Sequence, residues 1–340
     1  MKRASWAPRP WSSDCSTPPR KPTTDSAGCP RDRRAPEPKK EAAVTTDLSP
    51  WPHRPVEVGL VGAGPWARAM HARVLAAGPE TRLAAVWARR TDAAREAAAP
   101  YAAHVAADFD ELLDHCEAVA FAVPPAVQAE LAPLAAKAGK AVLLEKPLGP
   151  DLDSARRVAD AVSEAGVVSQ FVLTKRYHPA TRSFLEAARA AQVTGARSCY
   201  LHGAFLGGEM ATGWRLEHGA LLDLGPHLID LLNTAVGPIA AIRATGDPRR
   251  WIELTCEHAN GAVSQATLSG SVNVPRAITR VELFGAGQPL MYDTAEINHE
   301  DCWPVLRREF ADAVRTGTSA ELDARYGLNL QALLDGVVLG

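Results

Sequence analysis

One short stretch, residues 56–67, constrains the fold of this chain more than any other. A valine-rich apolar run, Val56–Val61, is followed by Gly62-x-Gly64-x-x-Ala67 and then by a helical pattern. This layout is typical of the first turn of a dinucleotide-binding fold. The first glycine turns the chain, the second lets the backbone approach a pyrophosphate, and the alanine permits close helix–strand packing. Pro65 lies near the first helical position, where its missing N–H costs nothing, and the free N–H groups there face the phosphates. The alternative is an ordinary strand–turn–helix unit made of small residues.

The rest of the first half alternates strands and helices. We expect further strands near residues 83–87, 118–123, 141–144 and 167–172, separated by helices that include segments near 66–77, 108–115 and 153–165. Continuous apolar strands separated by helices predict a parallel, doubly wound sheet. The expected fold class is therefore α/β, with a Rossmann dinucleotide-binding domain over residues 54–174.

The second half changes character. It predicts a helix near 179–191, a strand near 196–205, a loop rich in Gly and Trp, and a helix near 218–235. Strands follow near 239–245, 251–258, 262–271, 277–285 and 289–293, with Asn260-Gly261 as a hairpin turn, and helices near 303–316 and 325–338. We expect residues 175–340 to form an α+β substrate or oligomerisation domain with a largely antiparallel open sheet.

The first 53 residues differ from all that follow. The first fifty hold nine prolines and ten Lys/Arg, with few aliphatic residues and no periodicity, so we expect a disordered tail over residues 1–53. No apolar core follows its basic residues, which argues against a secretory signal, and no run in the chain approaches the ~20 apolar residues of a membrane-spanning helix.

The cysteine spacing and the net charge indicate the cellular compartment and the classes of partner that we expect. The six cysteines show no CxxC motif and no metal-ligand spacing, which predicts reduced thiols in a cytoplasmic protein; they are Cys15, Cys29, Cys116, Cys199, Cys256 and Cys302. A formal net charge of -2 gives no electrostatic reason to expect nucleic acid or an anionic membrane as a partner.

Arg89-Arg90 follows the second expected strand, where NAD enzymes normally carry an Asp or Glu that bonds the adenosine ribose. No carboxylate occurs after that strand until Asp92. A guanidinium binds a 2′-phosphate through paired, charge-assisted hydrogen bonds, whereas a carboxylate would repel it. The sequence therefore favours NADP(H) as cofactor, with NAD(H) as the other candidate. A solvated basic turn is the alternative interpretation.

Glu145-Lys146-Pro147 stands at the carboxyl end of a buried strand, where ligands bind in open α/β sheets. A lysine at this edge either contacts a substrate hydroxyl or the nicotinamide ribose, or is simply exposed to water. A cis peptide before Pro147 would re-aim the lysine side chain.

Asp223 and His227 are four residues apart, and we expect them on one face of a single helix. Three interpretations compete: a pair that moves a proton on a polyol, half of a metal site with His218 nearby, and a buried structural pair. The metal site is the least supported of the three, because no third ligand has convincing local spacing.

Taken together and in this order, the motifs resemble the glucose–fructose oxidoreductase/inositol dehydrogenase family, usually written Gfo/Idh/MocA. The resemblance covers about residues 56–325. It rests on the runs Gly62-Ala63-Gly64-Pro65-Trp66-Ala67, Phe121-Ala122-Val123-Pro124-Pro125, Glu145-Lys146-Pro147-Leu148 and Gly219-Ala220-Leu221-Leu222-Asp223-Leu224-Gly225-Pro226-His227-Leu228-Ile229-Asp230. One departure is Gln128, which stands where the family often has a histidine.

The resemblance implies an NAD(P)-dependent oxidoreductase that transfers a hydride between nicotinamide C4 and a carbon of a sugar, cyclitol or related polyol. It implies that Lys146, Asp223 and His227 meet as the catalytic residues. His227 is the first choice for the general acid/base, Lys146 bonds the reacting oxygen, and Asp223 orients a substrate hydroxyl or the imidazole. Whether Lys146 or His227 moves the proton stays open. The resemblance also implies a homo-oligomer formed through the exposed sheet face of the second domain.

The full set of predicted site residues follows from these motifs. The predicted cofactor-binding residues are Gly62, Gly64, Pro65, Trp66, Ala67, Arg89, Arg90, Val123, Pro124, Gln128, Glu145 and Lys146. The predicted substrate-binding residues are Lys146, Arg176, Arg215, Asp223 and His227. We expect no resident metal.

Two other functions are compatible with the same fold. The first is a non-catalytic NAD(P)-binding sensor or scaffold, which would have no chemical need for all three of Lys146, Asp223 and His227. The second is a dehydrogenase of hydroxy acids, which would need a cationic clamp for the carboxylate. Only Arg215 is placed for that role.

Overall fold

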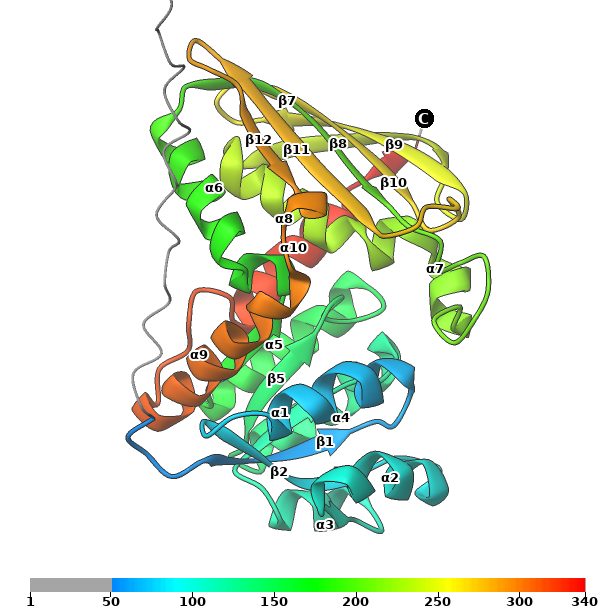
Figure 1. Cartoon of the computed structure of the whole chain (residues 1–340), viewed down its shortest axis with the longest axis vertical. Helices are drawn as coiled ribbons and strands as arrows, with labels where there is room; N and C mark the ends of the chain where they lie inside the picture. The colour runs from blue at the N-terminus through cyan, green and yellow to red at the C-terminus, as the bar shows by residue number, and fades with distance from the viewer. Residues whose placement is uncertain (1–50, 340) are drawn as a thin grey trace, which may run out of the picture. The chain divides into compact units, whose positions relative to one another are not determined.

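The computed structural model describes residues 51–339, and these contain two sheets (Figure 1). The predicted disordered tail falls, apart from residues 51–53, outside the described residues. The predicted fold class is confirmed: a parallel Rossmann sheet comes first, and a mixed, mostly antiparallel sheet follows. None of the helices found between residues 51 and 339 combines the length and the apolar character needed to cross a bilayer.

The first sheet has six parallel strands in the order β3-β2-β1-β4-β5-β6, the strand order of a dinucleotide-binding fold. Helices lie on both sides of it (Figure 1). Its strands are β1 (Val56–Val61), β2 (Thr81–Trp87), β3 (His104–Val105), β4 (Ala118–Phe121), β5 (Ala141–Glu145) and β6 (Ser169–Val172). The connecting helices are η1 (Ala67–Ala72), α1 (Arg73–Ala76), α2 (Thr91–Ala98), η2 (Ala99–Tyr101), α3 (Phe109–Asp114), α4 (Pro125–Lys137), α5 (Leu152–Ala165) and η3 (Thr174–Tyr177).

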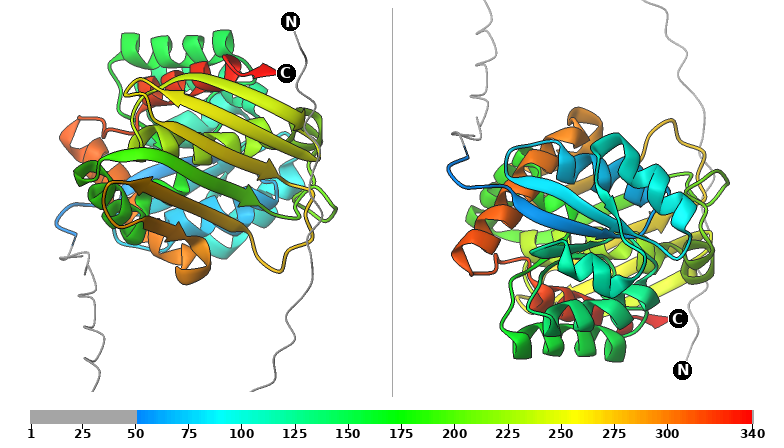
Figure 2. Two further views of the ribbon diagram at one scale, coloured as in Figure 1. Left: turned by 90° about the horizontal axis from the view of Figure 1, so that it is seen from above. Right: turned by 90° about the horizontal axis from the view of Figure 1, so that it is seen from below.

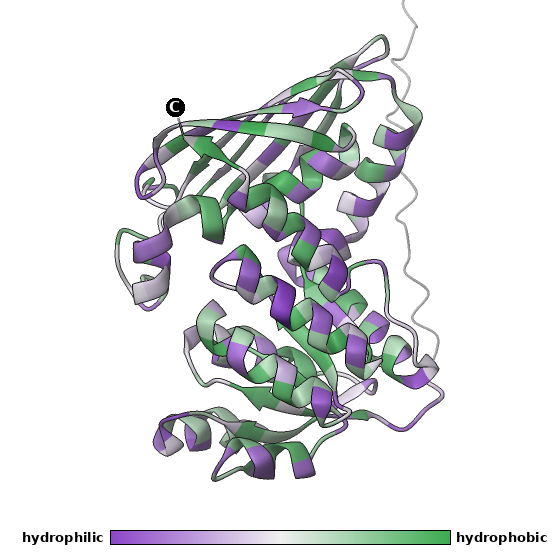
Figure 3. Ribbon diagram, turned by 180° about the vertical axis from the view of Figure 1, so that it is seen from behind, coloured by the Kyte–Doolittle hydropathy of each residue, from purple (hydrophilic) through white to green (hydrophobic). Residues whose placement is uncertain are grey.

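Local sequence explains these elements. In α5 the Asp151 side chain accepts a hydrogen bond from the Ser154 amide and caps the helix, and Gly166 ends it in the left-handed region. Ala155, Val158 and Val162 recur at helical spacing and are buried. Strands β1, β4 and β5 of the first sheet are buried along nearly their whole length, and in Figure 3 the strands of this sheet are largely green between helices that carry both colours. A strand with both faces buried reads in the sequence as a continuous apolar run.

The second sheet has seven strands in the order β12-β11-β7-β10-β9-β8-β13. Most neighbours are antiparallel, but β7–β10 and β8–β13 are parallel pairs. The strands are β7 (Val193–Leu201), β8 (Ile239–Asp247), β9 (Trp251–His258), β10 (Val263–Ser269), β11 (Ile278–Gly285), β12 (Leu290–Asp293) and β13 (Val338–Leu339). The hairpin predicted at Asn260-Gly261 joins β9 to β10, and Gly261 has a φ of 84° there.

One face of the second sheet is covered and the other is open. Side chains of β9 alternate between exposed and buried, as in a strand with one solvated face. Helices α6 (Pro179–Ala190), α7 (Gly213–Asp223) and α8 (Gly225–Ala235) lie on the covered side. Among the described residues no helix lies over the opposite face, which is in front in the left view of Figure 2.

The last helices pack back onto the first domain. Helix α9 (Cys302–Thr316) contacts α1 and η3, and α10 (Ala324–Asp335) contacts α5, β6 and α8. A buried ion pair of 2.7 Å between Arg307 and Glu80 ties α9 to the start of β2. The segment 175–340 therefore also packs against elements of the first sheet's half of the chain. Short 3₁₀ turns, η4 (Thr294–Glu296) and η5 (His299–Asp301), precede α9.

The structure also differs from the expected elements in detail. The helix expected near 66–77 begins with a π-helical segment, η1, before it becomes α-helical at α1. The two-residue strands β3 and β13 are too short to give a periodic signal in the sequence. The helix expected near 218–235 is two helices, as described below for the site.

Candidate active site

A cavity of about 840 Å³ lies at the carboxyl ends of the first sheet's strands and is also lined by residues of the second half. This edge is where ligands bind in open α/β sheets. Most predicted cofactor residues line it: Gly62, Gly64, Pro65, Trp66, Ala67, Arg89, Arg90, Val123, Pro124, Glu145 and Lys146. Arg215, Asp223 and His227 line it from the second half. The structure therefore brings together residues that are as much as 165 positions apart, from Gly62 to His227.

The glycine-rich turn leaves space for a ligand. Gly62 has a φ of 115°, and a Cβ on it would lie 2.3 Å from the carbonyl oxygen of Ala122, so a side chain is excluded. A Cβ on Gly64 would meet no described atom within 4 Å, so this position borders open space. Pro65 and Trp66 already have helical geometry, as expected for a proline at a helix start. This cradle fits a pyrophosphate bound by backbone N–H groups at a helix N-terminus.

Glu145 connects this turn to the end of β5. Its carboxylate accepts a hydrogen bond of 2.7 Å from the Trp66 indole and lies 2.8 Å from His71 Nε2. Burial alone would raise the pKa of Glu145, but the hydrogen bond and charge of His71 outweigh it, and the pKa lies below its ordinary value. The buried carboxylate thus fixes the helix after the glycines against the strand that carries Lys146.

The prediction that Gln128 contacts the cofactor is not supported by its position. The side chain is buried and does not line the cavity. Its amide donates to the Glu145 carbonyl at 2.8 Å and to the Leu148 carbonyl at 3.1 Å, and its oxygen accepts from the Glu145 amide at 2.8 Å. Gln128 therefore forms the hydrogen bonds of the backbone groups on either side of the Lys146–Pro147 bond, which is cis.

Lys146 and Asp223 form the central ion pair of the cavity. Lys146 Nζ donates to Asp223 Oδ1 at 2.7 Å and to the Asp223 carbonyl at 2.9 Å. Arg215 Nε lies 3.3 Å from the other carboxylate oxygen. Burial would raise the pKa of Asp223, but Lys146 and Arg215 outweigh it and lower the pKa. One carboxylate thus faces two cations at the domain junction.

The expectation that Asp223 and His227 share one helix is wrong. Asp223 is the last residue of α7, Leu224 separates the helices, and His227 lies in the first turn of α8. Pro226 is the physical reason, because it has no N–H to continue the ladder of α7 and fits the first turn of a new helix. No hydrogen bond joins Asp223 to His227 in the part of the chain that the structure describes. In this geometry the Asp223 carboxylate bonds Lys146 and lies beside Arg215 instead.

His227 is a buried imidazole near Lys146 and Lys175. Its ring meets the Tyr200 ring edge-on with centroids 5.9 Å apart, and its Nδ1 has no hydrogen-bond partner among residues 51–339. Burial, with Lys146 and Lys175 nearby, holds the pKa of His227 well below its ordinary value. The ring is therefore neutral at neutral pH. A neutral imidazole with a free nitrogen is available to a ligand in the cavity.

Arg176 is not placed to bind substrate. Its buried guanidinium bonds Asp230 at 2.8 Å, Thr234 at 3.0 Å and Tyr326 at 3.0 Å, and it also reaches Glu321. It does not line the cavity. Its position therefore does not support the predicted substrate contact, because these partners satisfy the guanidinium within a network that joins η3 to α8 and α10.

Several lining residues were missed by sequence reasoning. They come from β7 and from the loop and helix after it, and include Tyr200, His202, Met210, Thr212 and Trp214. Burial lowers the pKa of His202 to about 4, so this imidazole is also neutral at neutral pH. The signal available was the Gly- and Trp-rich composition of this loop, which marks an irregular segment but not its contacts.

Comparison with known proteins agrees with this architecture. Residues 56–172 match the model of the oxidoreductase family with an NAD-binding Rossmann fold, GFO_IDH_MocA, and residues 158–288 match the GFO/IDH/MocA C-terminal domain. The two matches together span residues 56–288, and so include the glycine turn, Lys146, Asp223 and His227.

Individual relatives are distant. Levoglucosan dehydrogenase of Pseudarthrobacter phenanthrenivorans is 28% identical over 160 residues, which are 45% of this chain and 40% of that protein. A dTDP-3,4-didehydro-2,6-dideoxy-alpha-D-glucose 3-reductase of Streptomyces violaceoruber is 27% identical over 195 residues, 56% of this chain and 57% of that protein. The chain thus matches only about two fifths to three fifths of the length of these curated relatives.

The structural similarity covers a larger share of the chain than the sequence similarity to these two relatives does. The solved structure of levoglucosan dehydrogenase with NADH and L-sorbose superposes with a TM-score of 0.76 at 20% identity, and covers 84% of this chain and 96% of that one. This likeness shows the same fold across both domains. The two family matches, which together span residues 56–288, lead to one conclusion: the chain belongs to the Gfo/Idh/MocA family of oxidoreductases.

Proposed function

We propose that this protein transfers a hydride between NADP(H) and a carbinol or carbonyl carbon of a sugar, cyclitol or related polyol. The observation that carries the proposal is the convergence of Lys146, Asp223 and His227 in the cavity that also holds the glycine-rich turn. A purely nucleotide-binding protein has no need for a part-buried lysine–carboxylate pair and a neutral imidazole beside its cofactor cradle.

The cofactor side of the cavity favours a phosphorylated adenosine ribose. Arg89 and Arg90 are exposed at the end of β2 and line the cavity, and Arg90 immediately precedes α2. Two guanidinium groups at this point can hold a 2′-phosphate by charge-assisted hydrogen bonds. When bound, the nicotinamide supplies or accepts the hydride at C4.

Lys146 would act on the reacting oxygen. Its ammonium group is already oriented by Asp223, so it can donate a further hydrogen bond to a substrate oxygen without losing its counter-ion. A cation at that oxygen favours the alkoxide character that develops as a hydride leaves or arrives. Arg215, on the opposite carboxylate oxygen, holds Asp223 in place and offers further donors to a hydroxylated ligand.

His227 would carry the proton. The neutral ring can accept the hydroxyl proton of an alcohol during oxidation and return it during reduction of the ketone. The cavity is also lined by the polar groups of His202 and Tyr200 and by the Trp214 ring. Hydroxyl groups alternating with C–H faces, as in a sugar or cyclitol, suit such a mixture of polar and aromatic lining. The names of the relatives, which act on sugars or sugar nucleotides, support the same substrate class.

We further propose that the protein is a homo-oligomer formed through the open face of the second sheet. Large apolar side chains are exposed on that face, with Trp251 at 45%, Val263 at 46% and Met291 at 62% exposure. A second copy would cover them, because apolar surface of this kind is favourably removed from water. Light scattering coupled to gel filtration gives the mass, and a monomer at micromolar concentration would contradict this proposal.

The enzymatic proposal is tested by turnover. Purified protein is mixed with NADPH and a panel of keto-sugars and inososes, and NADPH absorbance is followed. We expect oxidation of NADPH with at least one member, and a loss of at least about 100-fold in kcat for Lys146→Ala and His227→Ala, with NADPH still bound. Lys137→Ala, an exposed lysine at the end of α4, is the matched control and should retain full rate.

Two outcomes would refute the assignment. If wild-type protein binds NADPH but oxidises none of it with any member of the panel, a sensor or scaffold is the better description. If turnover occurs and both variants keep the wild-type kcat, the protein is an enzyme but Lys146 and His227 do not perform its chemistry.

A further inference from the structure

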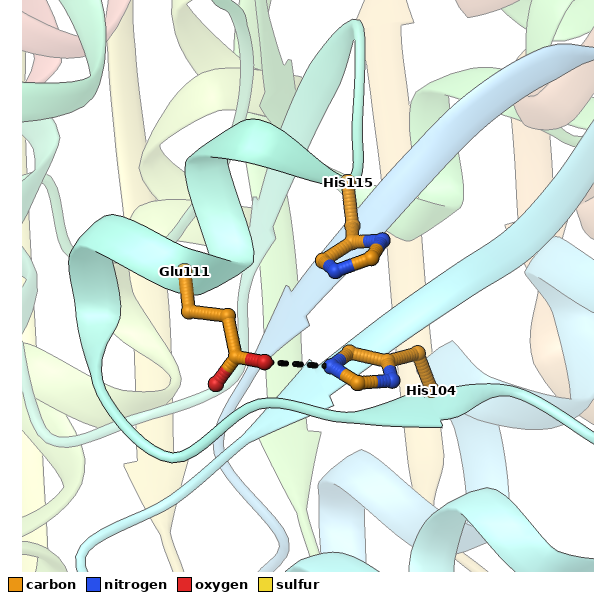
Figure 4. Close-up of side chains that lie close together, drawn as sticks. All are labelled: His104, Glu111 and His115. Carbon is orange, nitrogen blue, oxygen red and sulfur yellow. Dashed lines mark hydrogen bonds and ion pairs between the residues drawn. The ribbon is translucent and has the colours of Figure 1, made fainter.

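Three potential metal ligands meet at the outer edge of the first sheet. His104 lies in the edge strand β3, Glu111 in α3, and His115 directly after α3 (Figure 4). One ligand atom from each side chain lies within 4.8 Å of the other two. None of the three lines the cavity of the candidate active site, so the cluster needs an explanation of its own.

Glu111 is held in one orientation. One of its carboxylate oxygens accepts a hydrogen bond of 2.6 Å from the Ala107 amide, and the other lies 2.8 Å from His104 Nε2. The Asp108 side chain caps the same helix by accepting from the Glu111 amide at 2.8 Å. The backbone thus fixes one oxygen of Glu111 and leaves the second to face the histidines. Fixed carboxylates of this kind make good metal ligands, because their orientation needs no further ordering.

The two histidines lie against each other. Their ring centroids are 4.0 Å apart with an interplanar angle of 30°. Two protonated rings at this separation would repel one another, whereas two neutral rings present nitrogen lone pairs to a shared cation. The ion pair of Glu111 with His104 accounts for those two residues alone. It does not account for a second imidazole at the same place.

We propose that His104, Glu111 and His115 bind one divalent transition-metal ion of the zinc type. Two imidazole nitrogens and one carboxylate oxygen are a donor set that Zn²⁺ accepts with water in the fourth position, whereas Mg²⁺ and Ca²⁺ prefer oxygen ligands only. The His104 side chain is 40% exposed and that of Glu111 37%, so an ion can enter from solvent. The free oxygen of Glu111 already lies 2.8 Å from His104 Nε2, and a ligand nitrogen of His115 lies within 4.8 Å of both.

Such an ion would fasten the edge of the nucleotide-binding sheet. It would join β3 to α3, and Phe109, the first residue of α3, packs against Trp87 with ring centroids 5.8 Å apart. Trp87 lines the cavity next to Arg89 and Arg90. The ion should therefore stabilise the fold and the wall of the cavity nearest this edge, without taking part in the reaction.

The test uses the full chain without an affinity tag, stripped of metal by a chelator that is then removed. Zn²⁺ is titrated by isothermal calorimetry, and Co²⁺ is added separately to record its visible absorption, which reports coordination geometry. The variants are His104→Ala, His115→Ala and Glu111→Gln. The exposed His53→Ala is the matched control. Thermal melting of each metal-free variant checks that it is folded.

We expect one saturable Zn²⁺ site per wild-type chain, a rise in Tm on adding Zn²⁺, and a Co²⁺ spectrum with ligand-field bands. The alanine variants should bind at least about tenfold more weakly and lose the rise in Tm, while His53→Ala behaves as wild type. The proposal is overturned if the wild type shows no saturable site, or if His104→Ala and His115→Ala bind Zn²⁺ as tightly as wild type. The latter result would place the metal elsewhere, for example on cysteines.

Discussion

Replacing both arginines at the end of β2, in the variant Arg89→Ala/Arg90→Ala, should remove the preference for NADPH. Both side chains are exposed and line the cavity, so each can reach a bound phosphate from the solvent side. A hydrogen bond to a charged group contributes about 1.5–3 kcal/mol, and exposed ion pairs contribute about 1 kcal/mol or less. We therefore assign the pair a total of about 2–3 kcal/mol, which corresponds to an affinity ratio of roughly 30- to 150-fold.

The binding assay uses the protein's own fluorescence. Trp66 and Trp87 line the cavity, so energy transfer to the reduced nicotinamide or quenching should report occupancy by NADPH or NADH. Wild type should bind NADPH roughly 30- to 150-fold more tightly than NADH. The double variant should lose that factor for NADPH and keep its NADH affinity. Raising the salt concentration should shrink the wild-type ratio, because exposed charges are screened.

Arg95→Ala is the matched control for this experiment. Arg95 is an exposed arginine on α2 that does not line the cavity. Its replacement should leave both affinities unchanged. Equal affinities of the wild type for NADPH and NADH would refute the 2′-phosphate assignment, whatever the variants do.

Three further perturbations test other parts of the account. Gly62→Ala should lower the free energy of unfolding in urea by about 1–3 kcal/mol, because Gly62 has a positive φ and lies close to the Ala122 carbonyl. Gly64→Ala should keep wild-type stability and weaken only NADPH binding. Equal losses of stability in the two variants would contradict this reasoning. Because folding lowers the pKa of His202 to about 4, the unfolded chain takes up its proton first, so this contribution to stability is present above about pH 6.5 and is lost as the pH falls toward 4. His202→Gln should flatten that part of the urea-derived stability profile, and an unchanged slope would exclude this cause. Burial lowers the pKa of Lys175 to about 7. Lys175→Met should therefore stabilise the protein at pH 7 by about 2 kcal/mol or more, and by less at pH 10. An equal stabilisation at pH 7 and pH 10 would rule out desolvation as the cause.

Features encoded in local sequence were predicted well. The run from Val56 to Ala67 predicts a strand, a tight turn and a helix start, because apolar content, glycine and proline act within a few residues. The observed strand order, β3-β2-β1-β4-β5-β6, is that of the dinucleotide-binding fold which this glycine-rich turn predicts. The same topology brings Lys146 to the edge of the sheet where the cavity lies.

Features that depend on distant partners could not be predicted. The buried network of Arg176 involves Asp230 and Tyr326, which are 54 and 150 residues away, so the sequence around Arg176 carries no sign of it. Gln128 looks like a cofactor contact by alignment of motifs, yet it bonds the backbone on either side of Lys146, which becomes visible only when α4 packs beside β5.

The sequence contains a signal that could have predicted the break between α7 and α8. Gly225-Pro226 interrupts an otherwise helical apolar pattern, and proline in a helix normally marks a start or a break. The apolar periodicity on both sides outweighed this signal. On either side of the break, Asp223 bonds Lys146 and lies beside Arg215, while His227 opens the next helix.

The central claim is that the cavity containing Lys146, Asp223 and His227 transfers a hydride between nicotinamide and a sugar-type carbon. The most direct measurement is isotope transfer from NADPH that carries deuterium at C4, in both stereochemical forms, to each member of the keto-sugar and inosose panel. The account predicts that, from one of the two forms, a single deuterium appears in the product at the new carbinol carbon, as seen by mass spectrometry and NMR. Bound NADPH that never gives its deuterium to any product would contradict it.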